Sequence, residues 1–120
     1  MTNSVHCSPE NTSAAVEVQL RAAGAALAER GVEAVDILKL DTEGCEVPIL
    51  RSLAGLLPSL GVVFVEYHDE EDRREIDRLL GGTHVLCQGR VLAPHRGEFC
   101  YLARSRLPPG FRGGQIRKVF

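Results

Sequence analysis

The spacing of apolar and polar residues predicts five strands and three helices along the chain. Compact apolar runs of about four to eight residues, bounded by polar turns, are typical of strands. Apolar residues that recur every three to four positions indicate the buried face of a helix, and residues 49–57 have this spacing. The predicted strands cover residues 16–20, 35–40, 61–67, 83–88 and 98–103, and the predicted helices cover residues 21–30, 49–57 and 70–80.

Local signals mark the ends of the predicted helices. Gly31 can close the first helix, because glycine readily takes the left-handed backbone conformation just past a helix end. Pro48 fits the first turn of the second helix, where its missing N–H leaves no hydrogen bond unmade. Asp69 can cap the third helix, whose acidic first turn favours the helix dipole, and Gly81 and Gly82 end it.

The order of these elements predicts an α/β fold, in which a parallel sheet carries antiparallel strands at its edge. Too few helix-forming residues separate the last two strands for a crossover, so these strands are expected to form an antiparallel hairpin. Residues 1–14 are rich in Ser, Thr, Asn and Pro and are expected to form a disordered leader. Residues 15–104 would then form the folded domain, followed by a basic, flexible tail at residues 105–120.

The composition is that of an ordinary soluble domain. The 120 residues allow one domain, with 44% hydrophobic and 25% charged residues. A net charge of −2 gives no electrostatic case for nucleic-acid binding. No apolar run approaches the roughly 20 residues that cross a bilayer, and the polar N-terminus does not resemble a secretory signal. The expected location is therefore the cytoplasm, without membrane or nucleic-acid partners.

The four cysteines, Cys7, Cys45, Cys87 and Cys100, include no pair at the C-x-x-C spacing typical of metal sites. In a cytoplasmic protein they are expected to be reduced thiols. Cys87 and Cys100 would face each other if their two segments pair as a hairpin. They are the one pair for which a disulfide is worth testing.

Polar residues gather where two of the predicted strands end. Asp41, Glu43 and Glu46 follow one buried strand, and Glu66 and His68 end the next. Ligands of parallel sheets bind beyond the carboxyl ends of the strands, so these side chains are expected side by side on one rim. The alternative for the three carboxylates is a structural one, because acidic side chains also stabilise the start of a helix through its dipole.

Glu66 and His68 lie two residues apart and therefore on the same side of an extended segment. Such a pair can orient a substrate hydroxyl and accept its proton near neutral pH, or it can simply end a strand at the solvent. Together with Asp41 and Glu43, the pair could instead hold a divalent metal. Lys39 lies inside an otherwise apolar strand, so it either pairs with a carboxylate or reaches the rim.

Several common catalytic and nucleotide-binding motifs are missing from the sequence. No two glycines are separated by a single residue, so the dinucleotide motif G-x-G-x-x-G is absent. Walker A, G-x-S-x-G and H-E-x-x-H motifs are absent as well. The chain therefore shows no self-contained nucleotide or phosphate cradle.

Two stretches of the sequence resemble the FkbM-type methyltransferase family. They are KLDTEGCEVPIL at residues 39–50 and VEYHDEEDRREIDRLL at residues 65–80. PHRGEFCYLA at residues 94–103 is similar to the closing antiparallel strands of that family. The resemblance implies an S-adenosylmethionine-dependent enzyme that methylates hydroxyl groups of small molecules or glycans. It spans residues 16–104 and implies the C-terminal half of a Rossmann-like class I methyltransferase sheet.

The reaction that the resemblance implies, combined with the expected geometry of the rim, suggests roles for individual residues. His68 would accept the proton of the acceptor hydroxyl and Glu66 would orient His68, with Asp41 beside them. Asp41, Glu43 and Gly44 would contact the cofactor. The family's first half supplies a glycine-containing loop and a ribose-binding acid, and neither has a counterpart here. The chain is therefore expected to be a truncated domain, one part of a split enzyme, or a remnant that no longer binds cofactor.

Two other functions remain open at this point. One is a non-catalytic interaction module, and the other is a metal-dependent hydrolase built on the rim carboxylates. The strand at residues 35–40 has only residues 16–20 as a possible neighbour on its far side. An unpaired apolar strand invites another chain, so self-association or a partner that supplies the missing strands is expected.

Overall fold

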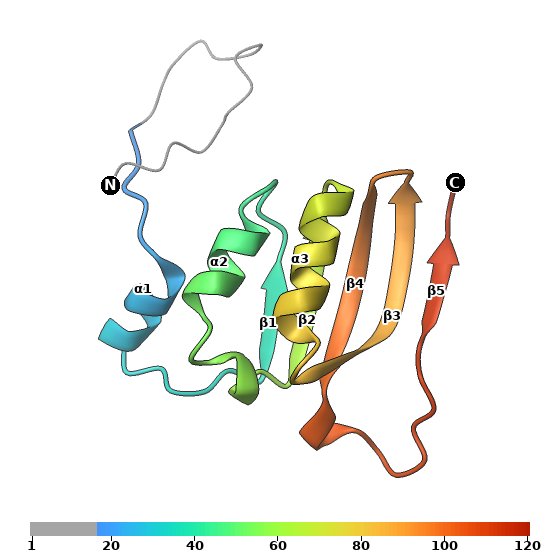
Figure 1. Ribbon diagram of the computed structural model, residues 1–120. Coiled ribbons are helices and arrows are strands. Elements are labelled where there is room, and N and C mark those ends of the chain that lie inside the picture. Colours follow the sequence, from blue (N-terminus) through green and yellow to red (C-terminus); the bar gives the residue numbers. More distant parts are fainter. Residues whose placement is uncertain (1–16) are drawn as a thin grey trace.

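In the part of the chain that the structure describes, residues 17–120, five strands form one mixed sheet with helices against one face (Figure 1). This computed structural model is an α/β fold, as the sequence predicts. The strands lie in the order β1-β2-β4-β3-β5. They are β1 (Ile37–Leu40), β2 (Val62–Tyr67), β3 (His84–Ala93), β4 (Arg96–Ala103) and β5 (Gln115–Lys118). The helices are α1 (Ala23–Glu29), α2 (Glu46–Ser52) and α3 (Glu70–Leu80), with short 3-10 turns η2 (Leu57–Ser59) and η3 (Arg104–Arg106).

The sheet is parallel at its two ends and antiparallel in its middle. β1 pairs with β2 in parallel, and β5 pairs with β3 in parallel. β4 lies between β2 and β3 and is antiparallel to both. The predicted hairpin of the last two strands is thus confirmed. It lies inside the sheet, however, because β5 adds a further strand beyond it.

Two expectations about the ends of the chain are wrong where the structure describes them. Residues 17–20 form no strand, and the side chains of Val18 and Leu20 are 67% and 46% exposed. Alternation over so few residues gives a strand only where a neighbouring strand is available. The segment predicted as a flexible tail instead contains β5. Gly114 brings this strand to the sheet, because a Cβ there would lie 2.0 Å from the carbonyl oxygen of Cys87. The predicted leader at residues 1–14, and position 16 of the first predicted strand, lie outside the described residues.

Helix α3 has the predicted bounds and the predicted cap. The backbone N–H of Asp72 donates to Asp69 Oδ1 at 2.7 Å. The second helix is shorter than predicted: α2 ends at Ser52, and η2 continues the chain after a turn. Leu53 and Leu57 are buried although they lie outside α2, so the apolar spacing extends further than the helix does.

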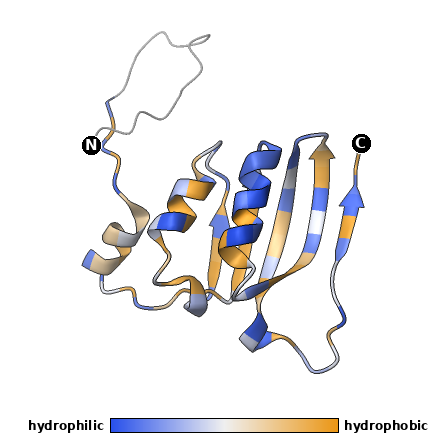
Figure 2. Cartoon of the chain, viewed as in Figure 1, coloured by the Kyte–Doolittle hydropathy of each residue, from blue (hydrophilic) through white to orange (hydrophobic). Residues whose placement is uncertain are grey.

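The core lies between the helices and the sheet. Its most deeply buried apolar side chains come from α2, α3, β2 and the segment before β2, and include Leu50, Leu60, Val63, Ile76 and Leu80. The helices pack on one face only, so the alternate residues of the strands point to the opposite face. Ile37 and Phe64 are exposed by 65% and 44%, respectively. Figure 2 shows that β2 is largely hydrophobic, whereas β5 is mostly polar.

The hairpin of β3 and β4 brings Cys87 and Cys100 together, as expected for paired segments. Their Sγ atoms lie 3.5 Å apart, and both are free thiols, as is Cys45. Burial, followed by the neighbouring Cys87, raises the pKa of Cys100 to about 12. Cys100 is therefore a thiol rather than a thiolate at neutral pH. Cys7 lies outside the described residues.

None of the helices in residues 17–120 has both the length and the apolar character that a bilayer crossing requires.

Candidate active site

The turn between β1 and α2 is held in place by Glu46. Its carboxylate accepts hydrogen bonds from the backbone N–H groups of Thr42, at 2.7 Å, and Gly44, at 3.0 Å. The Glu46 side chain is 1% exposed, so its charge is satisfied by the turn rather than by solvent. Glu43 and Gly44 have φ values of 54° and 108°. Left-handed backbone is uncommon for a glutamate, and Glu46 stabilises it here.

Glu66 lies at the end of β2 and is nearly buried. Its neighbour Tyr67 points to the helix side of the sheet, where its ring packs on Phe99 with centroids 4.9 Å apart. Glu66 points to the opposite face, where Arg96 Nε donates to Glu66 Oε1 at 2.6 Å. Burial and a side-chain hydrogen bond with Asp41 raise the pKa of Glu66, against the opposing effect of Arg96. The two carboxyl groups thus interact across the carboxyl ends of β1 and β2.

His68 lies among three carboxylates. Its Nε2 is 3.2 Å from Glu43 Oε2 and 3.7 Å from Glu66 Oε1, and its Nδ1 is 4.0 Å from Glu46 Oε2. Both ring nitrogens are buried and make no hydrogen bond among the described residues. The structure therefore brings His68 and Glu66 together as the sequence predicts. Glu43, however, is the carboxylate nearest to the ring.

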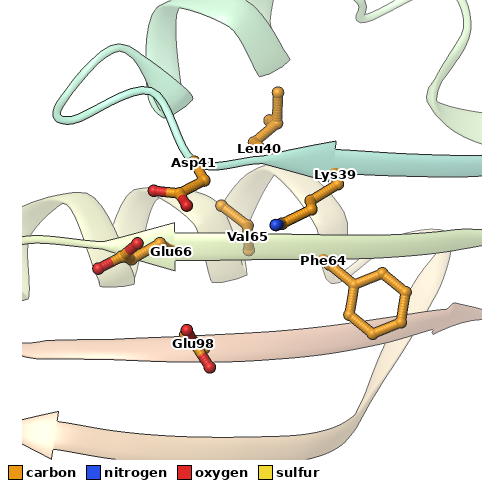
Figure 3. Close-up of a pocket in the computed structure, with 7 residues that line it drawn as sticks. All are labelled: Lys39, Leu40, Asp41, Phe64, Val65, Glu66 and Glu98. Carbon is orange, nitrogen blue, oxygen red and sulfur yellow. The ribbon is translucent and has the colours of Figure 1, made fainter.

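A hollow of about 350 Å³ opens beside these groups on the face opposite the helices (Figure 3). The carboxylates of Asp41, Glu66 and Glu98 border it at the ends of neighbouring strands. Its apolar lining comes from Leu40, Phe64 and Val65, with Lys39 completing the lining. The arrangement combines an apolar surface with several carboxyl groups at the carboxyl ends of β1 and β2. A small molecule with a positive charge would be complementary to it.

The comparisons with known proteins decide the family. A model described as the Methyltransferase FkbM domain matches residues 2–91. The chain belongs to the FkbM methyltransferase domain family. The predicted family resemblance is thereby confirmed. No curated protein matches the chain significantly, and neither does any solved structure.

Within this FkbM domain, the structure places every predicted site residue on one rim. Asp41 and Glu66 interact, and His68 lies between Glu43 and Glu66. Gly44 is exposed in the turn, and its backbone N–H donates a hydrogen bond to the Glu46 carboxylate.

The position of Lys39 is also settled for this FkbM domain. The sequence left two alternatives for Lys39: pairing with a carboxylate or reaching the rim. In the structure Lys39 is exposed, lines the hollow and makes no ion pair among residues 17–120. An otherwise apolar strand accommodates the charge in this way, because the ammonium group stays in contact with solvent.

Sequence reasoning missed two members of the site of this FkbM domain, Arg96 and Glu98. Both come from β4, which follows the rim residues by about thirty positions and reaches them through the β2–β4 pairing of Glu66 with Glu98. One signal in the sequence pointed to Arg96. A carboxylate at the end of a buried strand requires a cation or hydrogen-bond donors, and Arg96 lies in the predicted hairpin.

Proposed function

We propose that this chain forms the acceptor side of an S-adenosylmethionine-dependent O-methyltransferase, with the hydroxyl of a small molecule or glycan as its substrate. Membership of the FkbM family supports methyl transfer. The observation that carries the assignment of the site is the meeting of Asp41, Glu66 and His68 beside an open hollow. The strand order β1-β2-β4-β3, with β4 antiparallel, supports the C-terminal half of a Rossmann-like sheet.

His68 would act as the proton acceptor. An acceptor hydroxyl placed near Nε2 would transfer its proton to that nitrogen while its oxygen forms the new bond to carbon. Glu43 Oε2, at 3.2 Å, and Glu66 Oε1, at 3.7 Å, would stabilise the positive imidazolium that results. When bound, S-adenosylmethionine would supply an electrophilic methyl group on a sulfonium centre, with the sulfur–methyl bond breaking to leave a neutral thioether. Alignment and exclusion of water would provide much of the acceleration.

The residues that line the hollow fit one end of this cofactor. The three carboxyl groups of Asp41, Glu66 and Glu98 outnumber the one ammonium group of Lys39 in the lining of the hollow, and this excess suits a sulfonium or ammonium group. A volume of about 350 Å³ is at the lower end of the range of small-molecule sites, about 300–1,000 Å³. The sequence has no G-x-G-x-x-G loop for the remainder of the cofactor. Asp41, Glu43 and Gly44 are the groups that we assign to cofactor contact.

The chain alone is expected to bind S-adenosylmethionine weakly, with a dissociation constant above roughly 100 μM, because most contacts outside the charged end are missing. Calorimetric titration of the 120-residue chain measures this directly. A dissociation constant near 1 μM would show that other residues complete the cofactor site.

The catalytic assignment is tested by methyl transfer itself. The chain is incubated with methyl-labelled cofactor at about 2 mM, about twenty times the lower bound of the expected dissociation constant, and a panel of hydroxylated small molecules and glycans. We expect label in at least one acceptor as an alkali-stable methyl ether. Absence of transfer at this cofactor concentration would contradict activity of the isolated chain.

The free thiols Cys45, Cys87 and Cys100 support a cytoplasmic location for the protein.

A second proposal concerns association through β1. Within residues 17–120, β1 pairs with β2 on one side and with no strand on the other, and its Ile37 is 65% exposed. Open strand edges pair readily with another chain. We expect the purified chain to self-associate, or to require a partner that supplies strands. Light scattering that finds a monodisperse 13.1 kDa monomer at micromolar concentration, with slow amide exchange throughout β1, would contradict the proposal.

A further inference from the structure

We infer that Glu43, Glu66 and His68 form a binding site for a divalent first-row transition metal ion. One potential ligand atom from each residue lies within 4.8 Å of the other two. Ligands on opposite sides of a metal with bonds of about 2.1 Å are about 4.2 Å apart, so modest side-chain rotation closes the site. The nearer distances, 3.2 and 3.7 Å from His68 Nε2 to the two carboxylates, already suit ligands that are adjacent on one ion.

The state of His68 is an independent observation that points to a ligand. Both of its ring nitrogens are buried, and neither has a hydrogen-bond partner in the described part of the chain. Buried polar atoms are seldom left without a partner, because the loss of hydration is costly. Nε2 is close to Glu43 and Glu66, but the ring does not direct a hydrogen bond at either oxygen. A cation between these atoms would satisfy the nitrogen and both carboxylates at once.

Glu46 faces the other ring nitrogen and favours the tautomer that a metal requires. Its Oε2 is 4.0 Å from His68 Nδ1, and its charge is fixed by the backbone of the turn. A proton on Nδ1 is favoured by this nearby negative charge, which leaves the lone pair of Nε2 free. Metal-binding histidines are commonly oriented by a carboxylate on their second nitrogen in this way.

The charge around the site also favours a cation. Four carboxylates, from Asp41, Glu43, Glu46 and Glu66, lie close together, and the guanidinium of Arg96 and the ammonium group of Lys39 lie beside them. Arg96 contacts Oε1 of Glu66 through two of its nitrogens, so a metal would share this oxygen with Arg96 or take Oε2 in place of the hydrogen bond with Asp41. Two carboxylates and one imidazole favour ions such as Mn²⁺, Fe²⁺ or Zn²⁺ over Mg²⁺, which prefers oxygen ligands alone.

Metal binding has a consequence for the reaction, and this consequence rests on the proposed function. A metal on Nε2 occupies the lone pair that would accept the proton of the acceptor hydroxyl. The ion and the proton therefore exclude each other at His68, and a bound metal is expected to inhibit methyl transfer. Binding of the metal itself does not depend on the methyltransferase proposal and is measured without cofactor.

The test uses Mn²⁺ because it binds thiols weakly, so the cysteines do not interfere. The electron paramagnetic resonance signal of free Mn²⁺ is followed during titration of the full chain, in the presence of a tenfold excess of Mg²⁺. We expect one Mn²⁺ per chain with a dissociation constant below about 100 μM. Stoichiometric binding that Mg²⁺ does not displace supports the site. A dissociation constant above about 1 mM, or displacement by Mg²⁺, would overturn it.

Matched variants locate the ion. Glu43→Gln and His68→Gln are each expected to weaken Mn²⁺ binding about tenfold or more, because each removes one of the three ligands. Glu43 has a 73% exposed side chain, so its replacement leaves the core intact. Glu98→Gln is the control, since Glu98 also borders the hollow but is not a ligand. Equal binding by all three variants and the unmodified chain would contradict the assignment.

Discussion

Replacement of His68 by alanine is expected to lower the turnover of methyl transfer about 100-fold or more, which corresponds to about 2.7 kcal/mol of transition-state stabilisation. The reason is the loss of the proposed proton acceptor at the carboxyl end of β2. The Nε2 of His68 lies 3.2 Å and 3.7 Å from two carboxylates that would stabilise its protonated form. Steady-state kinetics with the methyl donor at a saturating concentration gives the turnover number directly.

The control for this variant is its stability. The His68 ring makes no hydrogen bond among residues 17–120 and its side chain is 23% exposed, so the melting temperature should change little. Turnover that equals that of the unmodified chain would reduce His68 to a polar residue at the end of a strand. A decrease in KM without a change in turnover would likewise contradict its role in proton transfer.

Replacement of Leu53 by alanine is expected to lower the free energy of unfolding by roughly 2–5 kcal/mol. Leu53 is 3% exposed and packs in the core at the end of α2. Truncation removes buried apolar surface and leaves a cavity that its neighbours fill only in part. Urea denaturation followed by circular dichroism measures the change in the unfolding midpoint.

Leu20→Ala is the matched control for Leu53→Ala. Leu20 is 46% exposed in a segment without regular structure, so its truncation should change the free energy of unfolding by less than about 0.5 kcal/mol. Equal midpoints for the two variants would mean that the end of α2 does not pack on the core as described.

The sequence predicted those parts of the fold in which several local signals agree. Helix α3 combines an apolar face, the Asp69 cap and an acidic first turn, and its bounds were predicted correctly. Strand β5 has no such signals, because its existence depends on the backbone of β3 and the close approach at Gly114. The opposite error occurred at residues 17–20, where alternation of side chains had no neighbouring strand to pair with.

The site was predictable to the extent that it follows from the parallel pairing of β1 and β2. Parallel strands end on the same rim, which is why the sequence alone places Asp41, Glu66 and His68 together. Arg96 could not be placed, since its contact with Glu66 requires the register between β2 and β4. The role of Glu46 was also hidden, because it acts through backbone N–H groups of a left-handed turn.

The contrast between the two edges of the sheet limits the symmetry of any assembly. β1 presents an apolar edge, whereas β5 at the other end has four exposed residues, including Arg117 and Lys118. If β1 pairs with β1 of a second chain, a twofold axis relates the two chains. Two copies then complete the assembly. Pairing of β1 with β5 would repeat without end and produce a fibre, and the cationic side chains of β5 oppose it. If the chain associates through its sheet, we therefore expect a closed dimer with a continuous sheet across the twofold axis.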